Sequence, residues 1–180
     1  MKRQTSAIAS VALLLTVACA AQPRKAETEQ SVTDAARGVR YIAPAGWNFS
    51  DAEIRSPRGS LLTLRVYDLV EADKKFVAGL PDTLIPQLLE WAELYYNVEG
   101  PPLRTATTIA GLPATELSYP VRARPKDPLS KVIYWVVVRK TRLFVIRTAY
   151  PASGLAQDEP VIRKVLDGWA FLETEGLDDE

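Results

Sequence analysis

The sequence contains no histidine and only one cysteine, Cys19, among its 180 residues. This composition excludes disulfide bonds within the chain, metal sites built from His and Cys, Ser-His-Asp triads and Cys-His dyads. An excess of charge is also missing, because 22 Lys and Arg balance 22 Asp and Glu. A neutral chain has no electrostatic basis for binding the phosphates of nucleic acid. We therefore expect no nucleic-acid partner, no metal and no cofactor.

One apolar run, residues 7–18, follows two basic residues at the start of the chain. Its length is typical of a signal peptide and too short to cross the roughly 30 Å hydrocarbon core of a membrane as a helix. The run ends in Thr16-Val17-Ala18-Cys19, which resembles the lipobox of bacterial lipoproteins, with Thr16 in place of the usual Leu. We predict that residues 1–18 are a signal peptide and that Cys19 carries a covalent lipid. An ordinary secretory signal with an incidental cysteine is the alternative.

Ala20 follows Cys19 and leads into a charged stretch up to Gly38 that has no aromatic residue. In lipoproteins of this type an Asp directly after the acylated cysteine signals retention in the inner membrane, so Ala20 favours the outer membrane. Residues 19–38 are expected to be a flexible tether with a reach of about 25 Å, since such a composition buries too little to become ordered. A short helix over residues 31–37 is the alternative. We expect a protein anchored in the outer membrane by its lipid, with the folded part facing the periplasm.

Residues 39–172 have the size of one folded domain, and the acidic residues 173–180 are expected to form a solvated tail. Segments rich in Val, Ile, Thr and aromatic residues are separated by turn residues, which predicts strands. The predicted strands cover residues 39–43, 53–56, 61–69, 104–109, 114–122, 131–140, 143–150 and 170–172. Short connections join the four strands between residues 104 and 150, one of them at Gly111-Leu112-Pro113, so these four should form an antiparallel meander.

Two further segments have the apolar periodicity of helices. One begins at Asp82 and stops before Gly100, and the other runs from Asp158 to Gly168 with Asp158 in its first turn. The strand predicted over residues 131–140 is apolar on both faces, so both faces need cover. An antiparallel sheet with one helix on each face provides it. We therefore predict an α+β fold, a three-layer α/β/α sandwich with a mainly antiparallel sheet.

The order of these elements resembles the PsbP/Mog1/DcrB-like superfamily over residues 39–172. The resemblance rests on YIAPAGW at residues 41–47, IAGLPA at 109–114, the paired strands VIYWVVV and LFVIRTAY, and GWAF at 168–171. It implies an α/β/α sandwich used as an accessory or adaptor module, as in the photosystem-associated, nuclear-transport and envelope-lipoprotein members. It implies no catalytic residue.

Basic side chains gather at the connection between two predicted strands. The end of one strand and the start of its antiparallel partner must lie together, so the side chains there should be neighbours. We predict that they contact an acidic partner surface or an anionic lipid, with a solvated loop as the alternative. The residues are Arg122, Arg124, Lys126 and Lys131.

The sequence does not favour an enzyme. Catalysis by a carboxylate pair needs two acids held in a cleft, and the acids here fall mostly on helix exteriors, in turns or in the tail. The four tryptophans, Trp47, Trp91, Trp135 and Trp169, are expected in the core, with a ligand cage as the alternative.

Two binding functions remain. We expect a non-enzymatic accessory or adaptor lipoprotein that binds another envelope protein. The alternative is a lipid- or small-molecule-binding lipoprotein with an apolar pocket between a helix and the sheet. A concave cavity of roughly a few hundred cubic ångströms favours the alternative, and a flat patch favours the adaptor.

Overall fold

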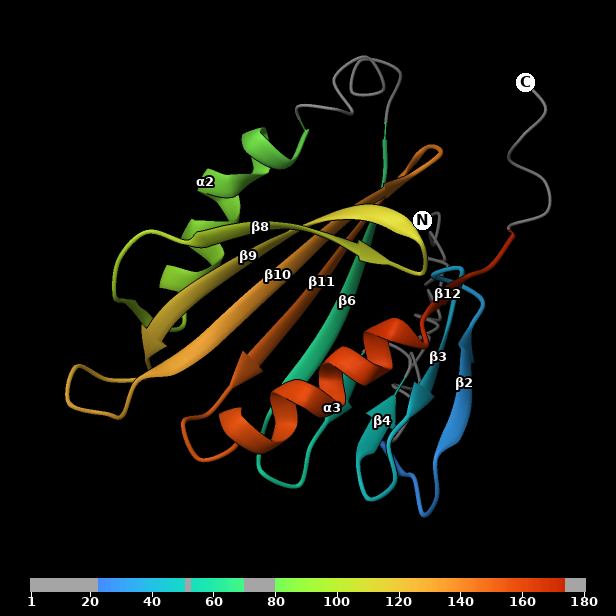
Figure 1. Cartoon of the computed structure of the whole chain (residues 1–180), viewed down its shortest axis with the longest axis horizontal. Helices are drawn as coiled ribbons and strands as arrows, with labels where there is room; N and C mark the ends of the chain where they lie inside the picture. Colours follow the sequence, from blue (N-terminus) through green and yellow to red (C-terminus); the bar gives the residue numbers. More distant parts are fainter. Residues whose placement is uncertain (1–22, 51–52, 70–79, 174–180) are drawn as a thin grey trace, which may run out of the picture.

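The computed structural model describes residues 23–50, 53–69 and 80–173 (Figure 1). The predicted signal peptide, Cys19 and residues 174–180 of the predicted tail lie outside these residues. The described part forms a large sheet, a small sheet and two helices, α2 (Leu80–Glu93) and α3 (Leu155–Asp167). Neither of these helices is long and apolar enough to span a membrane.

The large sheet is antiparallel throughout, and its centre is the predicted meander. Its strands are β1 (Arg24–Lys25), β4 (Asn48–Ser50), β5 (Glu53–Arg55), β6 (Leu61–Asp68), β7 (Asn97–Val98), β8 (Leu103–Ile109), β9 (Leu112–Arg122), β10 (Ser130–Arg139) and β11 (Arg142–Tyr150). Their order is β1-β4-β5-β6-β11-β10-β9-β7, with β8 also paired to β9. Strands β8 to β11 are consecutive neighbours, which confirms the meander.

Tight turns set the register of the meander. Strands β8 and β9 join at Ala110 and Gly111, whose φ angles are 51° and 78°. Positive φ angles at both central residues give a turn whose twist matches that of a hairpin. The predicted turn at Gly111-Leu112-Pro113 therefore lies slightly too late, because Leu112 and Pro113 already pair with β8.

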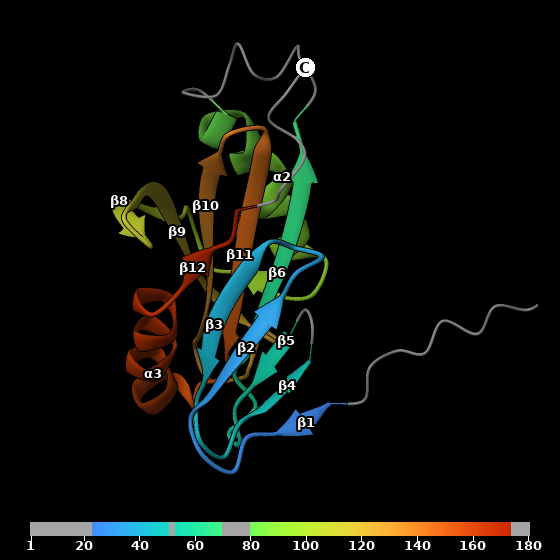
Figure 2. The same cartoon turned by 90° about the vertical axis from the view of Figure 1, so that its right-hand side faces the viewer.

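The two faces of β10 bury different cores. Residues 133, 135 and 137 belong to one apolar cluster, and residues 132, 134 and 136 belong to another. The first cluster contains Ile162 and Val165 of α3, whereas the second contains Leu88 and Ala92 of α2. Successive side chains of a strand point to opposite faces, so one face of β10 shares its cluster with α3 and the other face shares its cluster with α2 (Figure 2). Residues 132–137 of β10 are at most 2% exposed, so both faces of its doubly apolar sequence are buried.

A small sheet lies on the α3 side of the molecule and was not predicted. It consists of β2 (Gln30–Asp34), β3 (Val39–Ala43) and β12 (Ala170–Phe171), in the order β12-β3-β2. The buried residues of β3 belong to the same apolar cluster as those of α3. This face of the large sheet is therefore covered by a helix and a second sheet.

The predicted tether over residues 19–38 is wrong for residues 23–38, and so is the alternative helix over residues 31–37. Strand β2 pairs with β3 along its whole length, and β1 pairs with β4. Ala26, which lies between β1 and β2, is fully buried. Asp34 is also buried, and its carboxylate forms an ion pair with Arg37 at 2.7 Å. The backbone hydrogen bonds to β3 and β4 order this segment, although its own side chains bury little apolar surface.

The described residues confirm an α+β fold with a mainly antiparallel sheet and two helices. Helix α2 begins at Leu80 and α3 at Leu155, slightly before the predicted starts at Asp82 and Asp158. Glu173, the first residue of the predicted tail, pairs with Arg139 at 2.6 Å.

Candidate functional site

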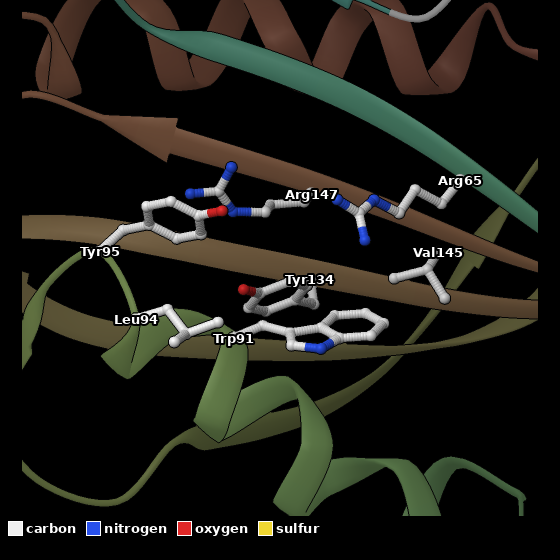
Figure 3. A pocket seen from close by; sticks show the side chains of 7 residues that line it. All are labelled: Arg65, Trp91, Leu94, Tyr95, Tyr134, Val145 and Arg147. Carbon is white, nitrogen blue, oxygen red and sulfur yellow. The ribbon is translucent and has the colours of Figure 1, made fainter.

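A recess opens on the α2 face of the large sheet. Helix α2 packs mainly against β7 and β10, which leaves β6 and β11 partly uncovered on this face. The recess between the helix and these strands has a volume of about 200 Å³ (Figure 3). We call it the α2 recess. Its lining residues are Arg65, Trp91, Leu94, Tyr95, Tyr134, Val145 and Arg147.

Strand register brings two arginines into the α2 recess. Arg65 on β6 pairs with Val145 on β11, and Arg147 pairs with Tyr134 on β10. Residues opposite one another in neighbouring strands project from the same face, and Tyr134 and Val145 belong to the cluster under α2. Both arginines therefore project toward the helix, where Trp91 and the segment after α2 close the recess.

Aromatic rings hold both guanidinium groups. The Arg65 guanidinium lies 5.3 Å from the centroid of the Trp91 ring, and that of Arg147 lies 5.8 Å from the centroid of the Tyr95 ring (Figure 3). Arg147 also donates a hydrogen bond to the Tyr96 hydroxyl at 3.4 Å. Neither arginine forms an ion pair with any carboxylate of the described residues. Two positive charges thus share one recess, and no carboxylate of residues 23–50, 53–69 or 80–173 neutralises them.

A buried hydroxyl adds a third polar group. Tyr134 is 1% exposed, and its hydroxyl has no hydrogen-bond partner among the described residues. Burial raises the pKa of Tyr134, although the nearby positive charge of Arg147 opposes part of this effect. A buried polar group without a partner costs free energy. The buried Tyr134 hydroxyl lies beside the Arg147 guanidinium, and it has no hydrogen bond of good geometry among the described residues.

This arrangement suits an anion. A guanidinium donates hydrogen bonds in a planar fork that matches a carboxylate or phosphate. Arg147 is half-buried, which lowers the effective dielectric constant around its charge and strengthens the attraction, whereas Arg65 is exposed at the rim. Contact of both guanidinium groups with the Trp91 and Tyr95 rings limits their motion, so less conformational entropy is lost on binding.

The structure places the four predicted basic residues at the connection between β9 and β10, but it pairs two of them. Arg122 forms an ion pair with Glu99 at 3.0 Å, and Lys131 forms one with Glu159 of α3 at 2.9 Å. Arg124 and Lys126 are exposed on the loop and have no ion pair among the described residues. Their contact with a partner stays a prediction, supported by two free charges instead of four.

A polar network on the opposite face holds α3 to the sheet. Glu116 on β9 accepts a hydrogen bond from the Trp135 indole at 2.9 Å and two from Arg163 of α3 at 3.0 Å each. Burial opposes ionisation of Glu159, yet hydrogen bonds from Lys131 and Arg163 hold its pKa below the ordinary value. The charges of this network are paired, so we interpret it as structural.

Sequence reasoning missed the α2 recess. Three tryptophans are buried as expected, but Trp91 is half-buried and lines the recess. A signal was present in β11, because Arg147 lies in the interior of a mostly apolar strand, on the face that contributes Val145 and Ala149 to the cluster under α2. A charged residue is rarely placed there without a polar or anionic partner.

No family model and no curated protein matches the chain. Several solved structures share its architecture. The solution structure of cyanobacterial PsbP (CyanoP) from Synechocystis sp. PCC 6803 matches with a TM-score of 0.55 and 12% identity, over 91% of this chain and 98% of that one. The chain has a PsbP-like fold. A crystal structure from Bacteroides thetaiotaomicron VPI-5482, at 1.50 Å resolution, matches with a TM-score of 0.51 and 12% identity, over 83% of this chain and 49% of that one.

These likenesses show the fold alone. At 12% identity, the role of a residue in either structure cannot be assigned to a residue of this PsbP-like chain. The resemblance seen in the sequence is confirmed at that level. The function must be argued from the recess itself.

Proposed function

We propose that this chain is a non-enzymatic binding module that takes a small anion in the α2 recess. The observation that carries the proposal is the pair Arg65 and Arg147, which lie against aromatic rings with no carboxylate of the described residues to neutralise them. The buried Tyr134 hydroxyl supports it, because it lies in the same recess beside Arg147 and has no hydrogen bond of good geometry among the described residues. Of the two binding functions predicted from the sequence, the pair of arginines favours ligand binding between a helix and the sheet. The prediction expected an apolar pocket, whereas the recess is cationic and aromatic.

Substituting an arginine tests this function. With propanoate as the probe, Arg147→Gln and Arg65→Gln should each weaken binding about 10- to 100-fold, because a hydrogen bond to a charged group contributes about 1.5–3 kcal/mol. Isothermal titration calorimetry or NMR titration measures the dissociation constants.

Arg124→Gln is the matched control, since it removes the same charge from the exposed loop outside the recess. It should leave the affinity unchanged. A larger loss in Arg124→Gln than in the recess variants would contradict the proposal and assign binding to the loop predicted from the sequence.

We also propose that the module is anchored through a lipid on Cys19 in the outer membrane. Cys19→Ala is expected to move the protein from the membrane fraction to the soluble fraction, because the thiol is the acylated group. Ala20→Asp should leave the protein on membranes and shift it to the inner-membrane fraction. Unchanged partitioning of Cys19→Ala would refute the anchor.

A second candidate function is the accessory module that docks on an envelope protein. Leu94 and Tyr95 favour it, because they lie at the recess and are 73% and 67% exposed. Exposed apolar side chains around a cationic centre suit a protein that inserts an acidic side chain. A photo-reactive residue at position 94 is then expected to cross-link one dominant envelope protein in cells, while the same residue at Gln157 on α3 should not. Equal cross-linking from both positions would contradict docking at the recess.

We infer a three-layer α/β/α arrangement for the domain as a whole. The assignment of α2 and α3 to two different apolar clusters supports it. In this arrangement the recess belongs to the interface between the α2 layer and the sheet.

A further inference from the structure

A second cavity lies beyond the α2 recess at the end of the large sheet. Its volume is about 450 Å³, and its walls come from β6, β11 and the loops at residues 123–130 and 151–153. Apolar side chains form much of the lining, among them Leu61, Ala123, Pro128, Ala149, Pro151 and Ala152. We call it the distal cavity.

The distal cavity and the α2 recess lie end to end on one face of the sheet. Arg147 and Ala149 are two residues apart on β11, so they share a face and lie about 7 Å apart along the strand. Arg147 lines the recess and Ala149 lines the distal cavity. On β6, Arg65 and Leu61 also share a face. Arg65 lines the recess, and Leu61 lines the distal cavity.

Tyr96 stands between the two spaces. Its side chain lines the distal cavity, and its hydroxyl accepts the hydrogen bond from Arg147 in the recess. Tyr96 therefore lies where the two spaces meet. It is held by this hydrogen bond of 3.4 Å, by the Arg147 guanidinium 5.8 Å from its ring centroid, and by packing against the apolar cluster under α2.

We infer that the two spaces form a single site for an amphiphile that has one anionic head and one apolar chain. This inference rests on the proposed function of the recess and names the class of ligand. The head binds between Arg65 and Arg147, and the chain passes Tyr96 to lie along Leu61 and Ala149. Each methylene removed from water contributes about 0.8 kcal/mol, so a chain of several carbons dominates the affinity.

Charge fixes the direction of the ligand. Asp127 lines the distal cavity and repels an anionic head, and the positive charge of Arg55 there is already paired with Glu53 at 2.8 Å. Arg65 and Arg147, which have no ion pair within the part of the chain that the structure describes, lie at the other end. The head therefore binds in the recess and the chain in the distal cavity.

Calorimetry of the whole chain with decanoate and propanoate tests the inference, because the two probes share a head and differ in chain length. We expect decanoate to bind at least 30-fold more tightly than propanoate. Ala123→Trp narrows the distal cavity from its exposed rim, and it should weaken decanoate about 10-fold while leaving propanoate unchanged. Ala156→Trp makes the same change at an exposed position of α3 outside both spaces, so neither affinity should change.

The outcomes separate this inference from the proposed function. Equal affinities for the two acids would overturn the shared site and leave the anion site standing. A loss of decanoate binding in Ala156→Trp as large as in Ala123→Trp would also overturn it. Failure of both acids to bind would overturn the proposed function, and the shared site with it.

Discussion

Asp158→Ala should lower the free energy of unfolding by about 2 to 3 kcal/mol, because it removes hydrogen bonds that end on a buried charge. The Asp158 side chain is fully buried in the first turns of α3. It accepts a hydrogen bond from the Ser56 hydroxyl at 2.6 Å and one from Arg58 at 3.2 Å. Ser56 in turn accepts from the backbone N–H groups of Arg58 and Ser60, so one carboxylate holds the turn between β5 and β6 against the helix. Urea denaturation measures the loss.

Arg58→Ala is the control for this prediction. The Arg58 side chain is 51% exposed, so its ion pair with Asp158 should contribute only about 0 to 1 kcal/mol. The difference between the two variants isolates the hydrogen bond from Ser56. Equal and small losses in both variants would show that the carboxylate does not hold the turn.

The folded protein should lose stability steeply between about pH 10 and 12. Burial, followed by the neighbouring Tyr134, raises the pKa of Tyr119 to about 12 from 10.0. Burial likewise raises the pKa of Tyr134 and of Tyr150. Because the unfolded chain releases these protons first, the stabilisation is complete below pH 10 and is lost as the pH rises through the folded values. Urea midpoints measured across this range give the slope.

Tyr119→Phe checks the origin of the alkaline loss. The variant keeps the ring, which packs edge-on against Tyr134 at 5.9 Å, and removes the group that ionises. Its stability should therefore fall less steeply with pH than that of the parent. Tyr95→Phe makes the same change at a residue that is 67% exposed and is the matched control. Identical slopes in all three proteins would assign the alkaline transition to other groups.

The meander was predictable because its signals are local. Strands β9, β10 and β11 are rich in β-branched and aromatic residues, and their connections are short enough to leave antiparallel pairing as the one option. The doubly apolar pattern of β10 also indicated burial of both faces, and these faces belong to two different apolar clusters, one shared with α2 and the other with α3.

Elements stabilised by distant partners escaped prediction. Strand β2 has exposed or half-exposed side chains apart from Asp34, and its order comes from backbone pairing with β3. From the sequence, Asp158 is an acid of the kind favoured in the first turn of a helix. Its partner Ser56 lies 102 residues away, and no local sequence pattern predicts such a contact.

The candidate site escaped for the same reason. Arg65 and Arg147 are 82 residues apart in the sequence. The pairing of β6 with β11 brings them into one recess. The basic loop at residues 122–131 looked stronger because its charges are close in sequence. Glu99 and Glu159, which pair with two of those charges, come from other elements.

An NMR titration of the isotopically labelled whole chain with propanoate tests the central claim most directly. The side-chain N–H signals of Arg65, Arg147 and Trp91 report the α2 recess, and the backbone signals of Arg124 and Lys126 report the basic loop. We predict saturable shifts of the three recess signals at one common dissociation constant, with the loop signals unchanged. Shifts confined to the loop, or no saturable shift at the recess, would contradict an anion site beside α2.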